Sequence, residues 1–250
     1  MTTISIITTV FNGAATIGGC LQSIDRQTCK NVEHIVIDAD STDDTLAVLA
    51  TIPAGHRRVL SEPDKGIYDG MNKGLLLAGG DIVGILNADD MYADENVLQD
   101  VCDAFTEAEV DTCYGDLKYV DFADTSKTVR LWKSGGFDAG KFRWGWMPPH
   151  PTFFVRRKLY EQYGCFNQQL GTAADYELML RFLVKHKATS SYIPRVLVHM
   201  RNCGASNSTL ARRMEANRMD RKAWAVNGLR PFPWTLLCKP FRKLGQWVLR

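Results

Sequence analysis

The sequence lacks the features that mark several protein classes. Its seven cysteines form no CxxC pair, so we expect scattered reduced thiols rather than a zinc site or a disulfide framework. No apolar run is long enough to span a bilayer. The first strand is expected to begin at Ile4, which leaves no room for a signal peptide. Internal repeats and low-complexity segments are also absent. These absences predict a globular, cytoplasmic protein.

The composition is that of a soluble domain with one sizeable core. Among 250 residues, 45% are hydrophobic and 23% are charged. The net charge of +2 conceals an uneven distribution. Residues 201–250 hold eleven Lys and Arg against two acidic residues, a net of +9, whereas the first 200 residues carry a net of −7. A basic tail on an acidic body predicts an anionic partner for the tail.

Strand and helix patterns alternate through the first half of the chain. Strands are expected at 4–9, 32–38, 58–61 and 82–86, and helices at 14–27, from 42, at 67–78 and at 95–106. The second half predicts short, mainly antiparallel strands at 112–116, 117–122 and 128–132, a Gly/Pro-rich aromatic loop at 135–151, a strand at 152–155, a helix at 174–187 and an extended segment at 192–200. This order predicts an α/β fold with a Rossmann-like, mixed but mainly parallel sheet flanked by helices.

Two adjacent carboxylates, Asp89 and Asp90, follow the apolar run 82–86. Ligand sites in open α/β sheets lie at the carboxyl ends of strands. Side-by-side carboxylates repel each other, so the pair suits a site for Mg²⁺ or Mn²⁺, which take oxygen ligands. The alternative is a solvated turn that caps the next helix.

Polar residues also follow the two strands nearest the N-terminus. Asp38 ends the strand 32–38 and is positioned to accept hydrogen bonds from a nucleobase or a ribose. Ser41, with Asp44 three residues later, fits a capping box for the following helix. The segment Thr9–Gly13 ends the first strand, where Thr9, Phe11 and Asn12 are candidates to surround a nucleotide, although the segment equally describes a plain turn.

The segment 62–74 contains further candidates for donor binding. Lys65 is expected to reach a phosphate and Asn72 to face the pocket. Tyr68, Met71 and Leu75 have helical spacing, which favours a role in the core.

Asp175 opens the predicted helix 174–187. Thr172 and Asp175 fit the capping pattern [ST]xx[DE], so capping alone explains the carboxylate. The functional alternative makes Asp175 a general base, which must reach the proton that it removes and need not bind metal.

Together these segments resemble the family 2 glycosyltransferases of bacterial polysaccharide biosynthesis, which have the glycosyltransferase A fold. The matching segments are 5–12, 38–43, 62–74, 87–90, 150–154 and 174–181. Their order and spacing carry the resemblance, which covers roughly residues 1–206.

The resemblance implies roles for individual residues. The donor site would comprise Thr9, Phe11, Asn12, Asp38, Lys65, Asn72 and Asp89. Asp89 and Asp90 fill the Asp-x-Asp position that holds the metal, Asp175 matches the catalytic base, and His150 lies on the acceptor side or in the core. Ala174 replaces the acidic residue that usually precedes the base, which leaves Glu177 as the fallback. A donor-binding Arg of some relatives is replaced by Met71, so Lys65 or Lys73 would substitute. The segment 199–206 is similar to one that closes over the diphosphate.

The sequence thus predicts an inverting, metal-dependent glycosyltransferase of the hexosyltransferase class. It would use Mg²⁺ or Mn²⁺ to move a sugar from a nucleotide-diphosphate donor, a UDP-sugar, to a hydroxyl of a glycan or lipid-linked acceptor. The alternatives are a nucleotidyltransferase, which would need a glycine-rich phosphate loop that residues 8–13 lack, and a catalytically silent nucleotide-sugar binding module.

The tail is predicted to form a separate unit. Residues 1–206 would be the catalytic domain and 207–250 a basic, amphipathic helical extension. Basic residues mixed with Trp and Leu are typical of a helix in the membrane interface, here the cytoplasmic face of the inner membrane. The alternative is a helix that packs back on the domain. No motif for nucleic acid binding accompanies the charge.

Overall fold

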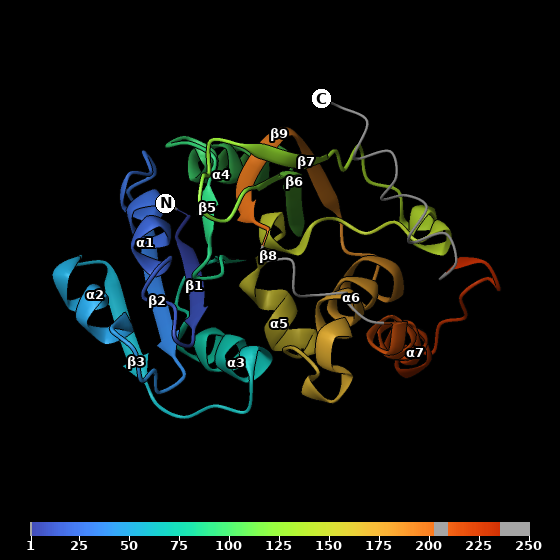
Figure 1. The fold of residues 1–250 in the computed structure, drawn as a ribbon. Helices are drawn as coiled ribbons and strands as arrows, with labels where there is room; N and C mark the ends of the chain where they lie inside the picture. Colours follow the sequence, from blue (N-terminus) through green and yellow to red (C-terminus); the bar gives the residue numbers. More distant parts are fainter. Residues whose placement is uncertain (1, 203–209, 236–250) are drawn as a thin grey trace.

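The computed structural model describes residues 2–202 and 210–235, which form a mixed sheet with helices on both faces (Figure 1). The strands are β1 Ile4–Val10, β2 Val32–Asp38, β3 Arg57–Ser61, β4 Ile82–Ile85, β5 Asp90–Tyr92, β6 Thr112–Val120, β7 Thr128–Trp132, β8 Phe154–Arg156 and β9 Ser190–Arg201. The α-helices are α1 Ile17–Asp25, α2 Thr45–Thr51, α3 Ile67–Leu77, α4 Val97–Glu107, α5 Arg157–Tyr163, α6 Ala174–Met179 and α7 Leu210–Val226. The 3₁₀ segments are η1 Ala139–Trp144, η2 His150–Thr152 and η3 Gln168–Ala173, and the π-helical turn η4 spans Leu180–Lys185.

The sheet has the strand order β3-β2-β1-β4-β8-β6-β9-β5, with β7 paired to β6. The half formed by β3, β2, β1 and β4 is parallel throughout. In the other half, β8 runs antiparallel to β4 and β6, β9 is parallel to β6, and β5 is antiparallel to β9. The predicted mixed, mainly parallel sheet is confirmed. The carboxyl ends of β1, β2 and β4 consequently meet at one edge.

Strand β1 lies at the centre of the parallel half, and all seven of its residues are buried. Ile4 and Ile6 face one layer, where Val101 of α4 packs, and Ile7 faces the other, where α3 packs. A strand covered by helices on both sides needs apolar side chains on both faces, which explains the continuous β-branched run.

Helix α3 lies close against the sheet because of a glycine. A Cβ atom added to Gly74 would lie 2.3 Å from Cγ2 of Ile7 on β1. Only a residue without a side chain allows this approach. The glycine therefore fixes the distance of α3 from β1, and α3 supplies one wall of the site described below.

The structure corrects four local expectations. Residues 112–116 and 117–122 form one strand, β6, rather than two. The segment 135–151 is not a plain loop, because it contains η1 and its Phe142 and Trp146 are buried in the core. Helix α2 begins at Thr45 without a Ser41 cap. The helix expected at 174–187 is α6 followed by the π-helical turn η4.

The described part of the C-terminal tail packs on the domain. In α7, Trp224 is buried and donates a hydrogen bond from Nε1 to the Tyr176 hydroxyl at 2.9 Å. Thr235 is fully buried and its Oγ1 donates to the Arg143 carbonyl at 2.6 Å. The segment 236–250 lies outside the described residues, as do residues 203–206 of the segment 199–206. Across 2–202 and 210–235, no helix has the length and apolar character needed to cross a bilayer.

Candidate active site

Buried polar atoms without partners gather at the carboxyl ends of β1, β2 and β4. Among the described residues, eight buried side-chain N or O atoms have no hydrogen-bond partner at normal geometry, and five of them are oxygens at this edge. They belong to Thr9, Asp38, Asn87 and Asp90. Buried polar atoms are nearly always paired in folded proteins, so such a group of acceptors indicates a place for a ligand.

Asp38 is fully buried, and only one of its two carboxylate oxygens has hydrogen-bond partners. Its Oδ2 accepts hydrogen bonds from the Ser41 amide at 3.1 Å and the Ser61 hydroxyl at 2.6 Å. Its Oδ1 has no partner. The two serines fix the carboxylate, and the second oxygen remains able to accept from a ligand.

Asn12 holds two loops together. It adopts a φ of 50°, its amide donates to the Ser41 hydroxyl at 2.8 Å, and its Oδ1 accepts from the Thr42 amide at 2.9 Å. The side chain thus ties the end of β1 to the loop after β2, which explains why Ser41 does not cap α2. The adjacent Phe11 is 63% exposed beside this junction.

Asp89 and Asp90 differ in environment. Asp90 is fully buried and neither carboxylate oxygen has a partner at normal geometry. Burial, and after it the charge of Asp89, hold the pKa of Asp90 well above its usual range. Asp89 is only partly buried.

Oxygen-rich carboxylates of this kind fit a divalent cation. No group of three or more His, Cys, Asp or Glu side chains in 2–202 and 210–235 is close enough to hold a metal ion alone. Mg²⁺ is usually held by one or two carboxylates together with substrate phosphates, and the residues present fit that arrangement.

Three candidates from segment 62–74 have defined surroundings. Asn72 donates to the Phe166 carbonyl and accepts from the Phe166 amide, both at 2.9 Å, so its side-chain amide orients residue 166. Lys73 pairs with Glu62 at 2.8 Å, which raises the pKa of Lys73. Lys65 is exposed just before α3. Of the two lysines, Lys65 is therefore better placed to meet a phosphate.

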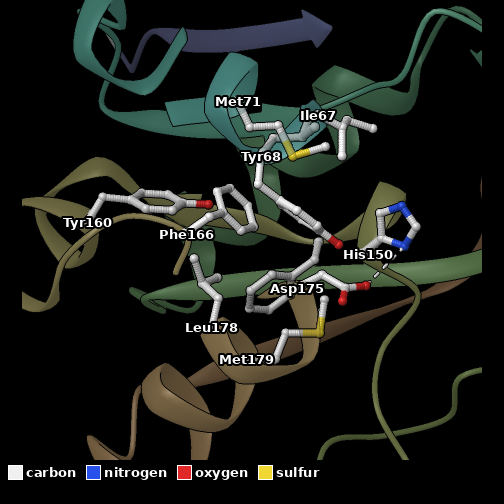
Figure 2. Close-up of a pocket in the computed structure, with 11 residues that line it drawn as sticks. Ile67, Tyr68, Met71, His150, Tyr160, Phe166, Asp175, Leu178 and Met179 are labelled. Carbon is white, nitrogen blue, oxygen red and sulfur yellow. Dashed lines mark ion pairs between the residues drawn. The ribbon is translucent and has the colours of Figure 1, made fainter. Parts of the chain in front are cut away.

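Asp175 lies at the start of α6 beside His150. Its Oδ2 is 3.6 Å from Nδ1 of His150, and its Oδ1 accepts from the Tyr176 amide at 2.7 Å. Residue 173 is the N-cap of α6, so the predicted capping role of Thr172 is wrong. Figure 2 shows the carboxylate directed toward His150 and Tyr68. The simple capping explanation for Asp175 therefore fails.

Tyr68 is the residue of this site that the sequence missed. It hydrogen bonds to Asp175, and burial, followed by the charge of Asp175, raises its pKa. Burial lowers the pKa of His150, while the charges of Asp175 and then Asp89 oppose that shift. Asp175 is thus flanked by a phenol and by an imidazole that is neutral at pH 7. Helical spacing alone gives no signal that separates Tyr68 from a core residue.

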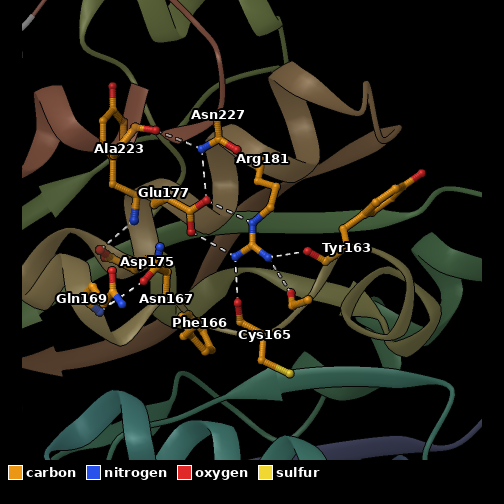
Figure 3. Close-up of polar contacts among 12 residues, drawn as sticks. Tyr163, Cys165, Phe166, Asn167, Gln169, Asp175, Glu177, Arg181, Ala223 and Asn227 are labelled. Atoms are coloured by element: carbon orange, nitrogen blue, oxygen red, sulfur yellow. Dashed lines mark hydrogen bonds and ion pairs between the residues drawn. The ribbon is translucent and has the colours of Figure 1, made fainter. Parts of the chain in front are cut away.

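Glu177, the fallback base, is occupied in a buried ion pair. Arg181 donates from Nε and Nη2 to the two Glu177 oxygens at 3.0 and 2.9 Å, and Asn227, directly after α7, donates a further bond at 3.0 Å (Figure 3). The remaining donors of Arg181 reach the carbonyls of Tyr163, Gly164 and Cys165. Glu177 therefore joins α6, α7 and the turn after α5, and its oxygens face away from Asp175.

Comparisons with known proteins identify the family of this chain. Residues 5–164 match the family described as "Glycosyl transferase family 2". A "PGL/p-HBAD biosynthesis glycosyltransferase" from Mycobacterium bovis (strain BCG / Pasteur 1173P2) is 32% identical over 210 residues, which cover 82% of this chain and 79% of that protein. An uncharacterised glycosyltransferase from Mycobacterium tuberculosis (strain CDC 1551 / Oshkosh) is 31% identical over 185 residues, covering 72% of this chain and 68% of its own.

Solved structures show the same fold at low sequence identity. S. aureus TarS 1–349 superimposes with a TM-score of 0.70 at 18% identity, covering 97% of this chain and 72% of TarS 1–349. The mannosyltransferase PcManGT from Pyrobaculum calidifontis, solved with GDP-Man and Mn²⁺, has a TM-score of 0.68 at 18% identity, covering 96% of this chain and 70% of that one. This chain spans only 39% of a longer TarS chain.

Proposed function

The chain belongs to glycosyl transferase family 2, and from that membership we propose that it is an inverting enzyme. It would transfer a sugar from a UDP-sugar to a hydroxyl group of a glycan or a lipid-linked acceptor. TarS 1–349 has been solved with UDP-GlcNAc and PcManGT with GDP-Man. Those complexes support a nucleotide-sugar donor for the shared fold. The relative from Mycobacterium bovis, named for PGL/p-HBAD biosynthesis, supports an acceptor in glycolipid assembly.

Asp175 acts as the general base in this proposal. The observation that carries it is the partly buried carboxylate at the cavity beside His150, with 17% of its side chain exposed, while Glu177 is consumed by Arg181. An ionised Asp175 removes the proton from the acceptor hydroxyl as that oxygen attacks the anomeric carbon. Base catalysis of this kind contributes about 10²–10⁴-fold.

The donor lies across the edge formed by β1, β2 and β4. Asp38 accepts from the nucleobase or ribose through its unpartnered Oδ1, and Thr9, Phe11 and Asn12 border the same edge. Asp89 and Asp90 would hold Mg²⁺ or Mn²⁺ together with the diphosphate. When bound, the cation neutralises charge on the leaving diphosphate. Lys65 adds a positive charge at the start of α3.

We also propose a membrane-facing surface formed by three aromatic residues. The rings of Trp144, Phe232 and Trp234 pack together in tilted and edge-on arrangements, with centroids 5.1 to 6.5 Å apart. Trp144 is 51% and Trp234 43% exposed, and the Arg143 guanidinium lies 5.0 Å from the Phe232 centroid. Exposed Trp with basic residues is typical of the membrane interface. The basic sequence 236–250 continues from this surface and suits an anionic cytoplasmic leaflet.

A screen of nucleotide sugars tests the proposed function. Purified full-length protein is incubated with Mn²⁺, a panel of UDP-, GDP- and dTDP-sugars, and lipid-linked and simple glycoside acceptors. We expect nucleoside diphosphate release that depends on the acceptor. Donor binding without turnover under any condition would instead favour the silent binding module. A parallel incubation with nucleoside triphosphates and sugar 1-phosphates tests the other alternative, because pyrophosphate release there would favour a nucleotidyltransferase.

A further inference from the structure

The cavity next to Asp175 is mostly apolar. It measures about 60 Å³ and its lining comes mainly from α3, β4, η2, α5 and α6 (Figure 2). The lining residues without a charged or strongly polar group are Ile67, Met71, Ile85, Phe153, Phe166, Leu178 and Met179. We define these seven residues as the apolar pocket. The polar residues that line the same cavity are Tyr68, His150, Tyr160 and Asp175.

Most residues of the apolar pocket are buried and also form part of the protein core. Met71 is 3% exposed, and Leu178 and Met179 are each 2% exposed. Ile67, at 48%, is the exposed lining residue. A single water needs about 10–15 Å³ of such space, so the pocket has room for a group of a few non-hydrogen atoms.

The chemistry of this lining selects against hydroxyl groups. Most ring carbons of an ordinary hexose carry a hydroxyl, which must find a hydrogen-bond partner when it is buried. The side chains of Met71, Leu178 and Met179 offer no strong hydrogen-bond partner to a hydroxyl group. Leaving a buried hydroxyl without a partner costs roughly 5- to 150-fold in affinity. A methyl group fits there without that cost and gains from burial.

We propose that the apolar pocket binds a small apolar substituent carried by one of the two substrates next to the reacting centre. This inference rests on the proposed function, because Asp175 forms one wall of the pocket and acts on the acceptor hydroxyl. The substituent is a methyl-sized group, such as the methyl of a 6-deoxy sugar or of an O-methyl sugar. It belongs either to the donor sugar or to the acceptor. The enzyme therefore prefers a deoxy or O-methyl sugar over its fully hydroxylated counterpart.

Matched substrate pairs test the proposal and separate the two sources. The donor pair is UDP-6-deoxyglucose and UDP-glucose, and the acceptor pairs are methyl 6-deoxyglucoside and methyl 3-O-methylglucoside, each against methyl glucoside. We expect one pair to differ by at least about 10-fold in kcat/KM, the usual scale for one methyl-sized group in an apolar pocket. The pair that differs identifies the substrate that fills the pocket.

Variants link that preference to the apolar pocket. Met71→Gln places an amide of similar size in the pocket and should reduce the preference by about 5-fold or more. Ile67→Gln changes an exposed residue at the mouth of the apolar pocket. Because Ile67 is not part of the core, this substitution should not disturb the fold. Leu76→Gln is the matched control, because Leu76 lies on the same helix, outside the pocket, and is 82% exposed. It should leave the preference unchanged.

A second measurement does not depend on turnover. Saturation-transfer NMR is recorded separately with UDP-6-deoxyglucose and with methyl 6-deoxyglucoside. At least one of the two should show transfer to its C6 methyl protons in the wild type and much less in Met71→Gln. An active enzyme that treats both members of every pair alike would overturn the proposal but leave the glycosyltransferase assignment intact. An inactive protein would count against the proposed function, and in that case absent transfer to the C6 methyl of both probes would overturn the pocket proposal separately.

Discussion

Asp175 and Glu177 lie two positions apart on α6, but loss of their charge should have different effects. Loss at Glu177 should lower stability, and loss at Asp175 should lower kcat. Glu177 is 4% exposed and accepts two hydrogen bonds from Arg181. Breaking a buried pair by removing one partner costs about 3–5 kcal/mol. Because glutamine keeps one accepting oxygen, Glu177→Gln should lower the free energy of unfolding by an amount near the lower end of this range, about 3 kcal/mol. For a domain of this size that lowers Tm by about 6–12 °C.

Asp175→Asn should behave in the reverse way. The asparagine oxygen can still accept from the Tyr176 amide, so Tm should stay within about 2 °C of the wild type. Without a base, kcat should fall by about 10²–10⁴-fold. Glu177→Gln, assayed well below its Tm, should keep kcat within a few-fold of the wild type.

Thermal denaturation and initial rates on the same preparations make the comparison. Glu161→Gln is the control, because Glu161 forms an i,i+4 ion pair with Arg157 on the surface, with 57% of its side chain exposed. Such exposed pairs contribute about 0–1 kcal/mol, so this variant should match the wild type in both assays. The reasoning is refuted if Glu177→Gln is as stable as Glu161→Gln, or if it loses as much kcat as Asp175→Asn.

Further predictions concern the cation, pH and the tail. Asp90→Ala should fold normally but lose the Mn²⁺-dependent part of UDP affinity in calorimetry; equal affinity with and without the substitution would contradict the assignment. Burial holds the pKa of His34 well below its usual range, so below about pH 6.5 the unfolded chain binds a proton that the folded chain does not. The free energy of unfolding in urea should therefore decrease from pH 7 to 5, and less steeply in His34→Gln; parallel slopes would count against this. The 250-residue chain should co-sediment with anionic liposomes at low salt, whereas a chain ending at Thr235, which keeps Trp224, Thr235 and the exposed aromatic surface, should bind them much more weakly; equal binding would remove the membrane role from 236–250.

The parallel half of the sheet was predictable because local sequence determines it. Strands β1 and β4 are buried runs of mostly apolar or β-branched residues, and β1, β2 and β3 are each followed directly by a helix. Asp38 and the pair Asp89 and Asp90 were predictable for the same reason, since the carboxyl ends of parallel neighbours meet at one edge. The antiparallel half was harder to predict from the sequence, because β6, β8 and β9 pair over long sequence separations that no local pattern encodes.

The surroundings of single side chains were not predictable from spacing. Tyr68 and Met71 have the same helical periodicity as core residues, and only the approach of α6 and η2 makes them line a cavity beside Asp175. Asn72 is a plausible ligand residue by type, yet residue 166 occupies its amide. The ion pair of Glu177 could have been predicted from the sequence, because Arg181 follows four residues later, the spacing at which side chains pair on a helix.

The tail shows how charge counts mislead when packing is unknown. Trp224 was assigned by composition to a membrane-facing helix, whereas in the structure it is buried against Tyr176. The polar helix α7 could be recognised as a packed element only through its contacts with α6, such as the bond from Trp224 to Tyr176, and through the bond from Asn227, directly after α7, to Glu177. The membrane prediction therefore now concerns the exposed aromatic surface and 236–250.

The anomeric configuration of the product tests the central claim most directly. Direct attack by an acceptor hydroxyl that Asp175 deprotonates inverts the reacting carbon, so an α-linked UDP-sugar should give a β-glycoside. Proton NMR of the purified product, taken from the first active pair in the donor screen, reads the coupling constant of the anomeric proton. From an α-linked UDP-sugar we expect only the β-linked product, formed at least about 100-fold more slowly by Asp175→Asn. A product that keeps the anomeric configuration of its donor would contradict the claim.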